Sequence, residues 1–146
     1  MILKILKAVW FLSLMGFMIL FLYIYASLPE NVILGDTLEA ATISRDSLFY
    51  IALILASLVN VLVFVITRLY GNSDDGFSTW FFGQIILLNF FFCTVLGFIN
   101  LLNSGEKFQY DRLGPVIYGS VILIVLWALA WPLYSFSRRF MGKQQV

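Results

Sequence analysis

Four long apolar stretches alternate with short polar segments along the chain. None of the four contains an Asp, Glu, Lys or Arg, and they cover about residues 8–26, 48–66, 80–102 and 115–134. A helix needs about 20 residues to cross about 30 Å of hydrocarbon. Barrel strands would alternate in polarity over about ten residues, so uninterrupted apolar runs favour helices. The pattern predicts an all-α fold, an integral membrane four-helix bundle forming a single transmembrane domain over residues 1–146.

Residues that begin and end helices stand at the edges of these stretches. Pro29 follows the first stretch, and the residue before a proline is disfavoured in a helix. Ser44 and Asp46 precede the second, where their side-chain oxygens can cap a helix start. Gly105 follows the third, and Pro115 opens the fourth at a position where its missing N–H is harmless. The four helices therefore have predictable limits.

The longest loop, about residues 27–47, is apolar for a connecting segment. It carries Val32, Ile33 and Leu34 in a row. We expect these side chains on the membrane surface or on a neighbouring chain, because contiguous apolar groups outside a core mark a surface that meets lipid or another protein.

Basic residues gather beside alternate ends of the stretches. The N-terminal segment, the second loop and the C-terminal segment hold six Lys and Arg residues, against three in the first and third loops. Because basic residues favour the cytoplasmic side, this count predicts an N-in/C-in topology. The first stretch is longer than the apolar part of a signal peptide, so we expect an uncleaved first helix. The two groups are Lys4, Lys7, Arg68, Arg138, Arg139 and Lys143 against Arg45, Lys107 and Arg112.

The composition fits a lipid environment and argues against several chemistries. Apolar residues make up 62% of the chain and charged residues 12%, whereas soluble domains average about 45–50% and about 25%. The net charge of +1 gives no basic surface for nucleic acid. There is no His, and the one cysteine, Cys93, cannot build a disulfide or a metal cluster alone. We therefore expect the lipid bilayer as a partner, no cofactor, no metal site and no catalytic residue.

The third stretch carries the most unusual set of polar and small residues. Asn89, Cys93, Gly97 and Asn100 are spaced i, i+4, i+8 and i+11, which places them in one stripe of a helix. Amides in hydrocarbon are unfavourable unless they are hydrogen-bonded. We interpret the stripe as a helix–helix seam, in which small residues allow close approach and amides bond across. The alternative interpretation is a polar lining for an ion or a small solute.

Two further amides extend this interpretation. Asn60 lies within the second stretch, and Gln84 lies on the third, about 140° away from Asn89 around the helix. If both Gln84 and Asn89 are buried, the third helix has partners on two sides, which favours contact with a second chain. Ser13, Gly16, Gly119 and Ser120 of other stretches can join the seam. The candidate helix-packing or partner-binding residues are Asn60, Gln84, Asn89, Cys93, Gly97 and Asn100.

A local resemblance covers residues 25–66. The stretch from Tyr25 to Val32 contains Leu28-Pro29, and residues 44–47 then lead into the second helix. This order resembles the helix, Leu-Pro, loop and helix unit of Sdp-type immunity and related small bacterial membrane proteins. The His-containing segment typical of that loop is missing here. The resemblance implies a bacterial inner-membrane protein and assigns no functional residues.

These observations favour a multi-pass inner-membrane protein without catalytic activity. We expect an accessory or structural subunit of a larger membrane complex, with other membrane protein subunits as partners. The alternative is a small membrane carrier or channel, possibly oligomeric, that uses the polar stripe of the third helix. An enzyme is not expected, because Cys93 lies in the middle of an apolar stretch that offers no base to form a thiolate.

Overall fold

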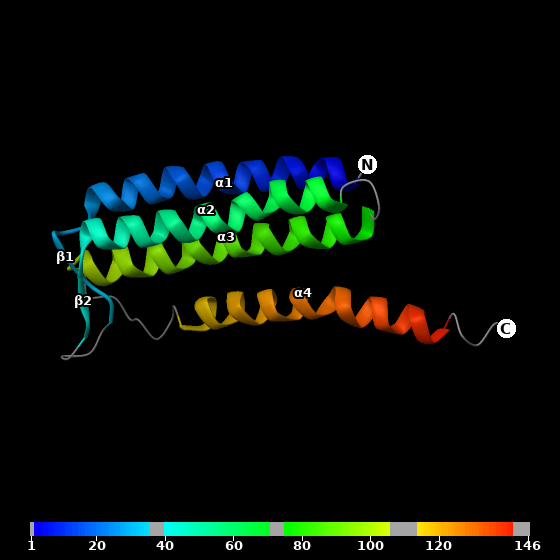
Figure 1. Cartoon of the computed structure of the whole chain (residues 1–146). Coiled ribbons are helices and arrows are strands. Elements are labelled where there is room, and N and C mark those ends of the chain that lie inside the picture. Colours follow the sequence, from blue (N-terminus) through cyan, green and yellow to red (C-terminus); the bar gives the residue numbers. More distant parts are fainter. Residues whose placement is uncertain (1, 36–39, 71–74, 106–113, 142–146) are drawn as a thin grey trace.

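The computed structural model describes residues 2–35, 40–70, 75–105 and 114–141. Its four helices are long and apolar enough to cross a membrane, which confirms the all-α integral membrane fold. They lie side by side, with the start of α1 and the end of α4 at the same end of the molecule (Figure 1). The elements are α1 (Ile2–Ser27), β1 (Asn31–Ile33), β2 (Thr42–Ser44), α2 (Arg45–Tyr70), α3 (Asp75–Asn103) and α4 (Gly114–Met141).

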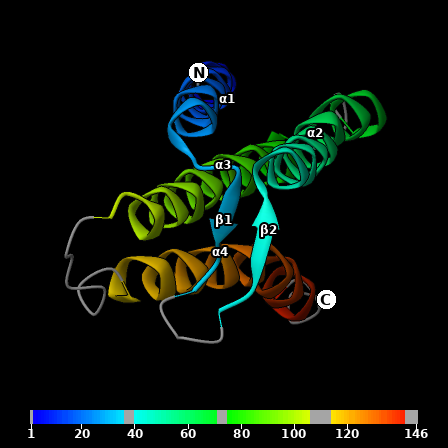
Figure 2. The ribbon, with the colours of Figure 1, turned by 90° about the vertical axis from the view of Figure 1, so that its left-hand side faces the viewer.

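The helix α3 lies at the centre and packs against each of the other three. The helix α4 lies on the side of α3 away from α1, as both views along and across the helices show (Figure 2). Large apolar side chains are exposed along α2 and α4, whereas on α3 Phe90, 58% exposed, is the one strongly exposed example among the described residues. The fold is a three-helix core to which α4 is attached through α3.

The local signals at the helix ends account for most of the boundaries. The helix α1 ends at Ser27, two residues before Pro29, as the sequence predicts. The hydroxyl oxygen of Ser44 accepts a hydrogen bond from the backbone N–H of Ser47 at 3.1 Å and so caps α2. Gly105 follows the end of α3 with φ +72°, a conformation that glycine adopts without steric cost.

The start of α1 and the end of α4 lie at one end of the bundle, which agrees with the predicted common side for the two termini (Figure 1). The assignment of that side to the cytoplasm stays a prediction. Lys107, Arg112 and Lys143, which enter the charge count, lie outside the described residues, and so does the end of the chain beyond Met141.

The first loop folds into a short antiparallel hairpin, which the sequence analysis did not predict. Strand β1 pairs with β2 in a register that sets Val32 opposite Ile43. The expectation for Val32 was wrong, because this side chain is 0% exposed and packs in the protein's own core beside Leu28. Ile33 and Leu34, in contrast, are exposed. β-Branched residues at both strands explain why the loop is extended.

The apolar core consists of two clusters at different depths of the bundle. The cluster near the hairpin includes Phe17, Ile24 and Leu96, and the cluster near the start of α1 consists of Val63, Phe82 and Ile85 with their partly buried neighbours. The two buried asparagines lie between these clusters along α2 and α3. The polar centre of the molecule is therefore enclosed by apolar layers above and below.

Candidate functional site

The two asparagines of α2 and α3 form a reciprocal amide pair in the middle of the bundle. Asn89 is 0% exposed and Asn60 is 6% exposed. The Nδ2 of Asn60 donates to the Oδ1 of Asn89 at 2.9 Å, and the Nδ2 of Asn89 donates back to the Oδ1 of Asn60 at 3.2 Å. Each amide therefore satisfies part of the hydrogen-bonding capacity of the other. This matters within a bilayer, because the hydrocarbon core offers no water to bond to.

The helix α1 completes this pair with two further side chains. The indole Nε1 of Trp10 donates to the Oδ1 of Asn60 at 2.9 Å. The second N–H of Asn89 donates to the hydroxyl of Ser13 at 3.0 Å, and that hydroxyl donates to the backbone carbonyl of Trp10 at 2.7 Å. The second N–H of Asn60 donates to the carbonyl of Ala56 at 2.9 Å. All four amide N–H groups are thus used, and we call these side chains the amide centre.

The amide centre has the properties of a structural joint. It links three helices, each through at least one side chain, and it contains no group that titrates near neutral pH. Its donors are all engaged, so a ligand could enter only by breaking bonds between helices. Within the described ranges, no three His, Cys, Asp or Glu side chains lie where they could hold a metal ion.

The remaining members of the α3 stripe have separate environments. Cys93 is half-buried and packs against the larger apolar cluster. The Oδ1 of Asn100 accepts a hydrogen bond from the hydroxyl of Ser27 at 2.8 Å, which ties the ends of α3 and α1 together. Asn89 and Asn100 therefore both bond to α1, at two depths.

The expected close approach at Gly97 is wrong. A Cβ added to Gly97 would meet no atom within 4 Å, and the same holds for Gly16 and Gly119. A helical wheel gives the direction of a residue but not the distance to the next helix, so it cannot tell a glycine at a contact from one beside a gap. The glycine at a true close approach is Gly83, which the sequence analysis did not single out.

Gly83 lies beneath the indole of Trp127 on α4. A Cβ at position 83 would come within 2.5 Å of that ring, so only glycine fits there without a shift. Beside this contact, the Nε1 of Trp80 donates to the backbone carbonyl of Trp127 at 2.6 Å, and the Nε1 of Trp127 donates to the carbonyl of Trp80 at 2.8 Å. We call these three residues the indole seam. It explains how α4 is attached to α3.

Gln84 lies on α3 next to the indole seam in sequence and away from the amide centre. It is half-buried, and its buried Oε1 has no hydrogen-bond partner among the described residues. The sequence predicts packing partners on two sides of α3. Because α4 of the same chain packs against α3 as well as α1 and α2, no second chain is needed to provide them.

A second polar group lies at the hairpin end. The side chain of Asn103 accepts from the backbone N–H of Ile33 at 2.9 Å and donates to its carbonyl at 2.9 Å, so it pairs with β1 as another strand would. The guanidinium of Arg45 lies 5.0 Å above the ring of Tyr25 and donates to the carbonyl of Leu28 at 3.3 Å. These contacts fix the hairpin on the ends of α1 and α3.

The fold and the closed amide centre define a multi-pass helical membrane protein with bonded helices. Comparisons with protein-family models, with curated proteins and with solved structures find no match to this chain. The resemblance of residues 25–66 to Sdp-type immunity proteins therefore stays a prediction.

Proposed function

We propose that this protein is a non-catalytic accessory or structural subunit of a larger complex in a bacterial inner membrane. The observation that carries the proposal is the closure of the amide centre. The buried amide side chains of the spans, Asn60 and Asn89, form hydrogen bonds between helices of the same chain. The outer surface of the helices is therefore mostly apolar, which suits contact with lipid and with other membrane helices.

The attachment of α4 supports the same proposal. Its span is the least buried of the four, and it packs along α3, so most of its surface is open to neighbours. In lipid the association of helices depends on close packing and on interhelical hydrogen bonds rather than on the hydrophobic effect.

The carrier or channel alternative is less well supported by this geometry. A polar path along the α3 stripe would need accessible amides, but Asn89 is fully buried and its N–H groups are bonded to Asn60 and Ser13. The stripe is also interrupted, because Cys93 packs into the apolar cluster between Asn89 and Asn100. Passage of a solute would therefore require the three-helix core to open.

The test is purification of the tagged full-length chain in mild detergent, followed by identification and quantification of the membrane proteins that co-purify. We expect a defined partner in a fixed ratio to the chain. Leu126→Ala should weaken its retention, because the substitution removes packing surface from the exposed side of α4, where Leu126 is 60% exposed. Leu58→Ala is a matched control, since it removes the same side chain at an equally exposed position of α2, where Leu58 is 61% exposed.

Reconstitution of the pure chain in liposomes provides the opposing result. Robust solute flux from the lone protein, together with no partner in a fixed ratio, would overturn the subunit proposal in favour of a carrier. Equal loss of the partner in Leu126→Ala and Leu58→Ala would contradict the role given to α4, while a partner in a fixed ratio would still support the subunit proposal.

A further inference from the structure

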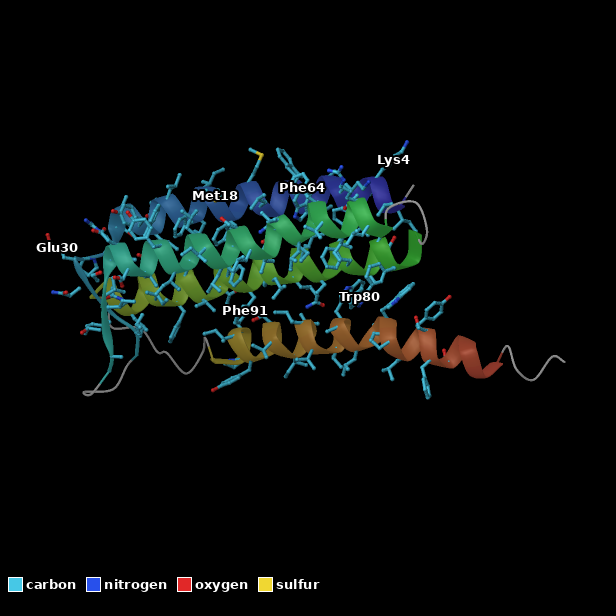
Figure 3. The ribbon with its side chains drawn as sticks, viewed as in Figure 1. Lys4, Met18, Glu30, Phe64, Trp80 and Phe91 are labelled. Atoms are coloured by element: carbon cyan, nitrogen blue, oxygen red, sulfur yellow. The ribbon has the colours of Figure 1, made fainter. Side chains whose placement is uncertain are left out.

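A groove opens between α1 and α2 near the start of α1 and the end of α2. Its volume is about 430 Å³, within the range of about 300–1,000 Å³ typical of ligand pockets. Trp10, Val63 and Phe64 form its walls, and Phe82 of α3 lies among the lining residues. Phe64 and Lys4 lie toward the same end of the bundle (Figure 3).

The polar residues of this groove lie at one level. Lys7 stands one residue before the first predicted span, and Thr67 and Arg68 follow directly after the second. Since α1 and α2 run in opposite directions, these positions meet at the same membrane interface (Figure 1). Trp10, Val63 and Phe64 lie within the predicted spans, at hydrocarbon depth. The groove is thus apolar along the bilayer interior and cationic where headgroups begin.

The charges of the lining select the sign of an occupant. Among its described lining residues, the groove has two cations and no acidic side chain. The Nζ of Lys7 lies 5.9 Å from the centre of the Phe82 ring, which holds the cation over the groove rather than away from it. Arg68 is exposed and offers a planar guanidinium, which suits the oxygens of a phosphate group.

We propose that this groove binds an anionic phospholipid, with its phosphate between Lys7 and Arg68 and part of an acyl chain along Trp10, Val63 and Phe64. Basic pockets between helices at a cytoplasmic interface are a known way to hold acidic headgroups. Clustered cations at a helix end also follow from topology alone, which does not require a groove between them. The apolar walls under the cations distinguish a lipid site from a free phosphate site. The proposal is independent of the subunit proposal above.

The test uses the purified full-length chain in mild detergent and native mass spectrometry. Dioleoyl phosphatidylglycerol and dioleoyl phosphatidylcholine, which share their acyl chains and differ in headgroup charge, are titrated in parallel. We expect preferential retention of phosphatidylglycerol. Lys7→Gln and Arg68→Gln should each lower that retention about fivefold, whereas Lys4→Gln should change it less than about twofold. Lys4 is the matched control, because it is an exposed lysine of α1 outside the groove.

Further measurements distinguish a phosphate carried by a lipid from a water-soluble phosphate. Millimolar inorganic phosphate and the water-soluble headgroup glycerophosphoglycerol should not displace the lipid, because neither fills the apolar walls. Displacement by either one would overturn the lipid assignment. Equal binding of the two lipids by the unmodified chain, or an effect of Lys4→Gln equal to that of Lys7→Gln, would also overturn it. The comparison of the two lipids uses the unmodified chain, so it does not depend on whether the variants fold.

Discussion

Two regions hold this protein together by different means, and α3 takes part in both. On one side, the amide centre joins α1, α2 and α3 through buried side chains that bond to one another. On the other, the indole seam joins α4 to α3 through two indoles that bond to backbone carbonyls over a glycine. The comparison shows that the amide centre joins helices through side-chain hydrogen bonds, whereas the seam depends on direct contact at Gly83.

The largest effect should come from filling the indole seam. Gly83→Leu places a side chain where even a Cβ would come within 2.5 Å of the Trp127 ring, so we expect a loss of about 3 kcal/mol and displacement of α4. Hydrogen exchange followed by mass spectrometry should show faster exchange along α4 while the three-helix core stays protected. Gly97→Leu is the matched control, because its Cβ meets open space. Equal exchange of α4 in both variants would contradict the seam.

A smaller loss is expected when the amide centre is broken. Asn89→Ala removes three hydrogen bonds between helices, at about 0.6 kcal/mol each, for a total of about 2 kcal/mol. Thermal unfolding in detergent, monitored by the reaction of Cys93 with a thiol-reactive fluorophore, measures the change. Here α1 to α3 should lose protection before α4 does. Asn100→Ala, which removes a single bond to Ser27, should cost about a third as much.

The hydrogen-bonding part of the seam can be separated from its packing part. Trp127→Phe keeps a ring over Gly83 but deletes the N–H that bonds to Trp80, so we expect a loss of about 0.6 kcal/mol. Trp131→Phe is the control, because the Trp131 ring stacks 6.4 Å from the Trp80 ring but is not part of the indole seam. Similar melting temperatures for the two variants would mean that contact, rather than the indole N–H, holds α4.

The hairpin lies outside both regions and should give the smallest effect. Asn103→Ala removes two bonds to the backbone of Ile33 at an exposed site, which should cost about 0.5 kcal/mol. Exchange should accelerate in β1 and leave the amide centre and α4 unchanged. A change that spread to α4 would show that the hairpin couples to the seam.

The sequence was sufficient for the four helices and for the burial of Asn89 on α3. Uncharged stretches of helical length predict the four spans, and Ser44 caps α2 as its position indicates. It could not rank the glycines, because Gly83 and Gly97 differ only in where another helix crosses α3, and that depends on residues far along the chain such as Trp127. The hairpin was missed because three-residue strands carry little pattern.

The chain order of the amide centre also has a consequence for biogenesis. Helices form in the order of synthesis, so Trp10 and Ser13 are present before Asn60 enters the membrane, and Asn60 before Asn89. Trp10 can give Asn60 one partner at once, but an N–H of Asn60 waits for α3. Insertion of α3 is therefore the step that commits the nascent chain to its fold, and α4, which shares none of these bonds, can dock last.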